Sequence, residues 1–167
     1  MRLQLADWVF EIHMDATMQY SAAEAAEHCD CAYCRNFYAA LDARYPDLRG
    51  ILGQFGADAE APEELMPFDL DGEMVYDGVW AVCGWITRKG SAPLSFGDIT
   101  VFPDPENHRH VKCFCPEPYF LLEISGLRLP WVLDEPMEQT VSPANLPSFL
   151  SQMWDKLLHG SERSRPS

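Results

Sequence analysis

The chain has little positive charge. Its 167 residues include 12 Lys and Arg against 26 Asp and Glu, which gives a formal net charge of −14 at pH 7. Nucleic-acid phosphates and anionic membrane surfaces are bound through Lys and Arg, so this balance argues against a nucleic-acid-binding protein and against a membrane-surface protein. A basic protein is the partner that an acidic chain of this kind would suit electrostatically.

Long hydrophobic runs are also missing. The longest uncharged apolar run, 79–86, is far shorter than the roughly 20 residues that a membrane-spanning helix needs. Asp7 and Glu11 interrupt the first residues, so no secretory signal is predicted there, and the sequence has no Asn-x-Ser/Thr site. We therefore predict a cytoplasmic location, in which the six cysteines are thiols or metal ligands rather than disulfides.

Familiar catalytic patterns are absent as well. The chain contains no G-x-S-x-G, Walker A, G-x-G-x-x-G or H-E-x-x-H motif, which favours a non-enzymatic protein. Apolar residues make up 47% of the chain and aromatic residues 12%, enough for a packed core without disulfides. At this length we predict a single α+β domain over residues 1–160 and a disordered tail at 161–167.

The first third of the chain shows both strand and helix periodicity. Residues 8–14 alternate between apolar and polar side chains, which predicts a strand with one wet face. Ser21 is placed to cap a short Ala-rich helix over 22–27. Two further helices are predicted, one from Ala32 that ends before Pro46 and one that starts near Pro46 and stops at Gly56. The apolar residues of the latter recur at helical spacing: Leu48, Ile51, Leu52 and Phe55.

An acidic segment follows. Eight carboxylates and no Lys or Arg lie between Asp58 and Asp77, and we predict a loop over 57–73. This loop is either a docking surface for a basic protein or a solvated surface segment.

The remaining sequence predicts strands and a last helix. Residues 74–87 indicate strand structure with a turn or bend at Asp77-Gly78, in which 79–86 forms a central strand covered on both faces. Further strands are predicted at 99–102, 110–115 and 119–125, with an edge segment at 127–133 and a helix at 147–159. The predicted fold is therefore α+β, a mainly antiparallel sheet of about five to six strands covered by three helices.

Three closely spaced cysteines are the main candidate metal ligands of the sequence. Cys29, Cys31 and Cys34 have the spacing C-x-C-x-x-C immediately before the predicted helix at Ala32. Zinc in structural sites takes four thiolate or imidazole ligands, often from a C-x-x-C turn. The three cysteines are thus predicted metal ligands, with zinc as the cofactor and a fourth ligand from His28 or from Cys113-Phe114-Cys115. The alternative is that these thiols are inert packing groups.

A third interpretation is a thiol oxidoreductase. A thiolate at a helix N-terminus is favoured by the helix dipole, so Cys31 would be the nucleophile and Cys34 its resolving partner. Arg35 and Asn36 follow on the same helix and are predicted to lie on its polar face.

Two stretches resemble a known group. The run Cys-Asp-Cys-Ala-Tyr-Cys-Arg-Asn-Phe at 29–37, with Leu-Pro-Trp-Val-Leu at 129–133, is similar to an uncharacterised bacterial protein family with a C-D-C-x-Y-C-R-N-F motif. The resemblance covers only these two stretches and implies no activity.

Overall fold

The computed structural model describes residues 1–27, 29–70 and 73–137. In these ranges the chain forms a seven-stranded antiparallel sheet and three helices, which confirms the predicted α+β class with more strands than the five or six expected. The predicted helix at 147–159 and tail at 161–167 lie outside the described residues. The strands are β1 (Arg2–Leu5), β2 (Trp8–Ile12), β3 (Glu64–Leu70), β4 (Glu73–Arg88), β5 (Leu94–Phe96), β6 (Ile99–Asp104) and β7 (Tyr119–Leu129).

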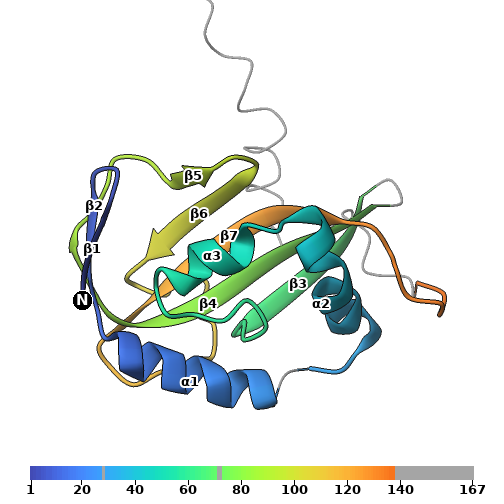
Figure 1. The fold of residues 1–167 in the computed structure, drawn as a ribbon, viewed down its shortest axis with the longest axis horizontal. Helices are drawn as coiled ribbons and strands as arrows, with labels where there is room; N and C mark the ends of the chain where they lie inside the picture. Colours follow the sequence, from blue (N-terminus) through green and yellow to red (C-terminus); the bar gives the residue numbers. More distant parts are fainter. Residues whose placement is uncertain (28, 71–72, 138–167) are drawn as a thin grey trace, which may run out of the picture.

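Strand β4 is the centre of the sheet (Figure 1). The strand order is β1-β2-β4-β7-β6-β5, and β3 pairs with the first half of β4. β2 pairs with the far end of β4, where Gly84 is required because a Cβ atom there would lie 2.1 Å from the carbonyl oxygen of Glu11. The prediction of a central strand covered on both faces at 79–86 is confirmed for residues 79–84, which are buried, but not for Trp85, which is exposed.

Of the predicted turn or bend at Asp77-Gly78, the turn is wrong, because both residues lie inside β4. A register shift against β7 between Tyr76 and Gly78 takes the place of the turn, and the Asp77 carboxylate accepts the backbone N–H of Gly126 across it at 2.8 Å. A bulge of this kind absorbs an extra residue without ending the strand.

Helix α1 (Met14–Ala26) is longer than the helix predicted at 22–27. Ser21 is not its cap. It is buried within the helix, where its hydroxyl accepts the backbone N–H of Asp58. The helix begins beside β4 because the N–H of His13 bonds to the carbonyl of Cys83, and the N–H of Cys83 bonds to the hydroxyl of Thr17. α1 thus satisfies backbone groups of β4 that pair with neither β2 nor β3.

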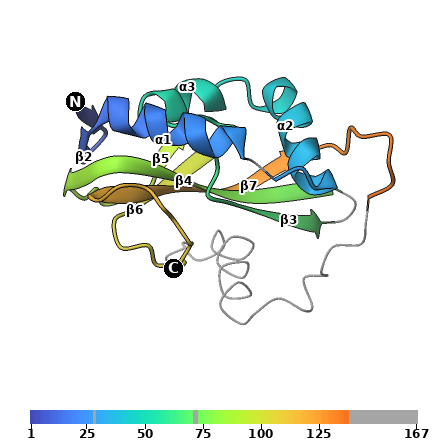
Figure 2. The ribbon, with the colours of Figure 1, turned by 90° about the horizontal axis from the view of Figure 1, so that it is seen from below.

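Helix α2 (Ala32–Arg44) lies where the sequence predicted it, whereas α3 (Leu48–Gly53) lies within its predicted span but is shorter and ends before Phe55. With α1 they lie on the same side of the sheet (Figure 2). The main core fills the space between this layer and the sheet. Its largest fully buried side chains include Phe10, Phe37, Phe55, Tyr76, Trp80 and Phe120.

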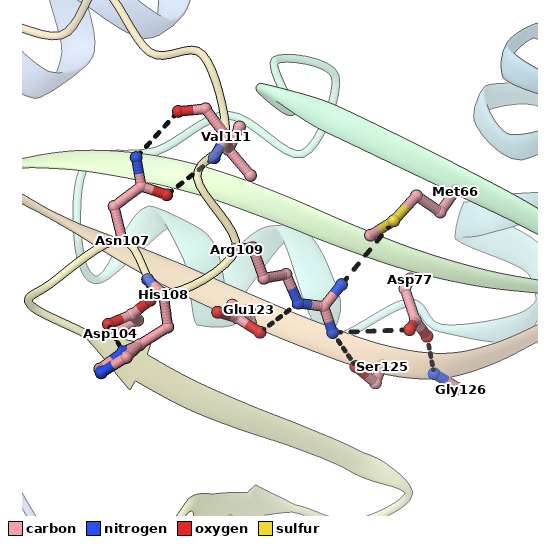
Figure 3. Close-up of polar contacts among 10 residues, drawn as sticks. All are labelled: Met66, Asp77, Asp104, Asn107, His108, Arg109, Val111, Glu123, Ser125 and Gly126. Atoms are coloured by element: carbon pink, nitrogen blue, oxygen red, sulfur yellow. Dashed lines mark hydrogen bonds and ion pairs between the residues drawn. The ribbon is translucent and has the colours of Figure 1, made fainter. Parts of the chain in front are cut away.

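The opposite side of the sheet carries the loop 105–118 (Figure 2). The predicted strand at 110–115 is wrong, since this segment has no ladder partner and forms part of that loop. Arg109 holds the loop on the sheet through ion pairs with Glu123 at 2.6 Å and Asp77 at 3.6 Å (Figure 3). Beside them, the ring nitrogen Nδ1 of His108 lies 2.7 Å from an oxygen of Asp104.

Two other predicted segments have mixed outcomes. The acidic stretch 57–73 is not all loop, because it contains β3. The predicted edge at 127–133 is confirmed in part, because residues 127–129 end β7 and pair with β4, whereas β6 pairs only with residues 121–124 of β7. Both strands gain ladder hydrogen bonds that composition alone did not indicate.

Candidate metal centre

The structure brings the three predicted ligands together at the start of α2. The sulfur atoms of Cys29, Cys31 and Cys34 lie within 4.8 Å of one another. Sulfurs bound to one tetrahedral zinc ion are about 3.8 Å apart, given Zn–S bonds of about 2.3 Å. The three thiols therefore need to move by only about 1 Å to hold a metal ion. Among the described residues, no second group of His, Cys, Asp or Glu side chains is drawn together in this way.

The local backbone explains this convergence. Cys31 is the N-cap of α2 and has an extended backbone conformation, so the chain turns sharply between Cys29 and Cys34. Arg35 braces this turn, because its guanidinium donates to the carbonyl of Asp30 at 2.9 Å. Cys34 is buried on the helix, whereas Cys29 and Cys31 are exposed. The cluster thus has one sulfur fixed against the core and two that face solvent.

Asn36 ties this turn to the segment 129–133. It is fully buried, which corrects its predicted place on a polar helix face. Its amide nitrogen donates to the carbonyl of Pro130 at 3.1 Å, and its amide oxygen accepts the N–H of Val132 at 2.7 Å. The ring of Tyr33 also contacts that of Trp131. The stretches 29–37 and 129–133 therefore form one packed unit.

Tyr76 adds a link from the sheet. Its hydroxyl accepts from the Asn36 amide at 3.1 Å and donates to the carbonyl of Tyr33 at 3.0 Å. The sequence held one signal for this arrangement, namely an Asn inside a helix, where its side chain competes with the backbone for hydrogen bonds.

The thiols of the cluster differ in acidity. Burial raises the pKa of Cys34, and the neighbouring thiols of Cys31 and Cys29 raise it further. Burial also acts to raise the pKa of Cys31, but the backbone amide of Cys34 and the thiol of Cys29 outweigh it, so the pKa of Cys31 is lowered. The site therefore favours a thiolate at Cys31 and opposes a second one beside it, unless a cation compensates the charge.

The cysteines form part of the wall of a pocket of about 340 Å³. A closed structural zinc site would need a fourth protein ligand beside these three thiols. The other lining residues are acidic, phenolic or apolar: Glu24, Glu27, Glu63, Glu64, Tyr33, Tyr38, Tyr76, Pro62, Leu65 and Pro67.

A fourth cysteine ligand is not present in the described part of the cluster. His28 lies outside the described residues. Cys115, which was considered as a fourth ligand, instead has its sulfur 3.1 Å from that of Cys83, and Cys113 lies in the same loop. The sequence did not pair Cys83 with Cys115, because their proximity depends on the course of the loop 105–118.

No protein-family model, curated protein or solved structure matches this chain. Among the described residues, no helix is both long enough and apolar enough to cross a membrane. The fold and the cysteine cluster together describe an α+β protein with a thiol site that can hold a metal ion.

Proposed function

We propose that this protein is a non-enzymatic zinc-binding domain in which Cys29, Cys31 and Cys34 are the ligands. The observation that carries the proposal is the convergence of three sulfurs within 4.8 Å at the N-terminus of α2. Thiolates are soft ligands that select zinc over magnesium or calcium, for which oxygen ligands are preferred. The proposal includes a cytoplasmic location, because the ligands must stay reduced.

The metal would have a structural role in this proposal. It would join the turn before α2 to the helix itself, and the contacts of Asn36 and Tyr33 would carry that order to the segment around Trp131. A closed structural site also needs a fourth ligand, for which the sequence offers His28.

The test is the metal content of the full chain, purified without chelator or affinity-column metal, together with its melting temperature. We expect one zinc per chain and a lower melting temperature after chelation. Metal at a thousandfold excess over its Kd contributes about 4 kcal/mol of folding free energy. Cys34→Ser should lose the zinc and this stabilisation together. The matched control is Cys113→Ser, a partly buried thiol outside the cluster, which should keep both.

The lowered pKa of Cys31 favours one alternative, a thiol oxidoreductase that uses the same site. The same samples distinguish the two functions. A chain without zinc, whose melting curve is unchanged by chelator, would exclude the metal proposal. Alkylation rates measured against pH would then decide the alternative, since an ordinary thiol titration at Cys31 excludes an activated nucleophile.

A further inference from the structure

The other three cysteines form a second thiol group, distinct from the proposed zinc ligands. Cys83 lies on β4, while Cys113 and Cys115 belong to the loop 105–118 on the other side of the sheet from the helices (Figure 2). The sulfurs of Cys83 and Cys115 are 3.1 Å apart. This is closer than the roughly 3.5–4.0 Å at which non-bonded carbon atoms pack best, and sulfur is the larger atom. Packing as small apolar residues does not require so close an approach.

The three thiols differ in their exposure to solvent. Cys83 and Cys115 are 1% and 5% exposed, so a solute does not reach either sulfur directly. Cys113 is only partly buried, and its sulfur accepts the backbone N–H of Cys115 at 3.4 Å. The Cys113 thiol is therefore the most accessible of the three and lies beside Cys115.

The surroundings of Cys113 stabilise a thiolate. The Tyr20 hydroxyl lies 4.0 Å from its sulfur. Hydrogen bonding from the Cys115 thiol acts most strongly on Cys113; together with the Cys115 backbone amide, Tyr20 and Glu63 it outweighs burial and lowers the pKa of Cys113 to about 6. A thiolate is the form that attacks a disulfide.

We propose that Cys83, Cys113 and Cys115 form a reversible redox site, in which small-molecule disulfides enter at Cys113 and the stable product is a Cys83–Cys115 disulfide. The oxidant is a low-molecular-weight disulfide, RSSR. The Cys113 thiolate attacks one sulfur of RSSR and releases one RS⁻, which takes up a proton. The Cys115 thiol, after losing its proton, then attacks Cys113 and releases the second RS⁻.

The last step transfers the bond to the buried pair. The Cys83 thiol loses its proton and attacks Cys115, which returns Cys113 to the thiolate. In total, two protein thiols are oxidised to one disulfide, and RSSR is reduced to two RSH. The product joins β4 to the loop 105–118, which Arg109 already holds on the sheet from its other end.

The test uses the full chain, reduced and then incubated with oxidised glutathione. Free thiols are alkylated in denaturant, so that buried ones react too, and disulfides are mapped by mass spectrometry. We expect a Cys83–Cys115 linked peptide that dithiothreitol reverses. A disulfide that closes a loop of this length should raise the melting temperature by about 10 °C. If Cys83 and Cys115 are both recovered as alkylated thiols, with no disulfide between them, the proposal is overturned.

The entry step has its own test. Cys113→Ser should form the same disulfide at least about tenfold more slowly, because the thiolate that attacks the oxidant is gone. An unchanged rate would overturn the role of Cys113, and Cys113→Ala provides the same test if the serine variant does not fold. Mapping with and without zinc separates this site from the proposed metal centre, since the Cys83–Cys115 product should form in both conditions.

Discussion

Asn36 is a single residue on which the geometry of the cysteine cluster depends. Its side chain has hydrogen-bond partners on β4 and in the segment after β7. Asn36→Ala removes the hydrogen bonds to Tyr76, Pro130 and Val132. Each such bond contributes about 0.5–1.5 kcal/mol net, so we expect a loss of about 2–4 kcal/mol in the free energy of unfolding. Urea denaturation measures it, with exposed Gln54→Ala as the control; equal losses in both variants would contradict this role.

The carboxyl of Glu63, also a single residue, makes the stability of the folded protein depend on pH. Burial and the nearby Cys113 raise the pKa of its carboxyl to about 8, although the hydrogen bond from Tyr20 opposes this shift. Between about pH 4.5 and pH 8 the folded chain holds a proton that the unfolded chain has released, so this carboxyl makes the folded state less stable as pH rises. Glu63→Gln cannot lose a proton and removes this effect.

We therefore expect wild-type protein to lose stability relative to Glu63→Gln between pH 5 and pH 8. Urea unfolding at a series of pH values gives the difference directly. Glu64→Gln, on the exposed neighbour in β3, is the matched control and should follow the wild-type curve. Parallel curves for wild type and Glu63→Gln would show that the carboxyl is already ionised across this range.

At the scale of elements, the ion-pair network at Arg109 decides where the loop 105–118 lies (Figure 3). The side chains of Arg109, Asp77 and Glu123 are 10%, 12% and 13% exposed. Burial raises the pKa of both carboxyls, and Arg109 acts against that shift in each. Removing the arginine would leave two buried carboxylates without a cation, which costs about 3–5 kcal/mol.

Arg109→Met should therefore destabilise the protein by about that amount, and amide hydrogen exchange in 105–118 should accelerate. Arg128→Met is the control. Arg128 pairs with Glu73 at the surface, where an ion pair is worth about 0–1 kcal/mol. A loop whose exchange is unchanged in Arg109→Met would mean that other contacts hold it.

At the scale of the whole molecule, the net charge of −14 is the dominant electrostatic property. Part of the acidity is compensated within the fold, since Arg49 pairs with Asp42, Asp58 and Glu60. Salt shortens the Debye length from about 30 Å at 0.01 M to about 10 Å at 0.1 M. Because repulsion among carboxylates disfavours the compact state, the melting temperature at pH 7 should rise by a few degrees with added NaCl.

Melting curves with zinc removed measure this effect at both salt concentrations. Near the pI of about 4.5 the net charge vanishes, and the salt effect should vanish with it. A fall with salt at pH 7 would show that the internal ion pairs outweigh the repulsion. The basic protein partner stays a prediction, for which a salt-sensitive association rate is the expected signature.

Local pattern was enough for several elements. The sequence by itself determined α2, whose predicted start at Ala32 is confirmed, and the apolar face of α3. It also determined the central position of residues 79–84 and the convergence of Cys29, Cys31 and Cys34. Helical spacing and a short C-x-C-x-x-C turn involve only neighbours along the chain, so their geometry follows from local backbone rules.

Only the tertiary structure decided the rest. The pairing of Cys83 with Cys115, the buried place of Asn36 and the ion pairs of Arg109 each join residues that are far apart in sequence. The predicted turn at Asp77-Gly78 and strand at 110–115 were wrong for the same reason. Whether a segment bends or pairs depends on hydrogen-bond partners that other strands supply, and those partners exist only once the sheet has formed.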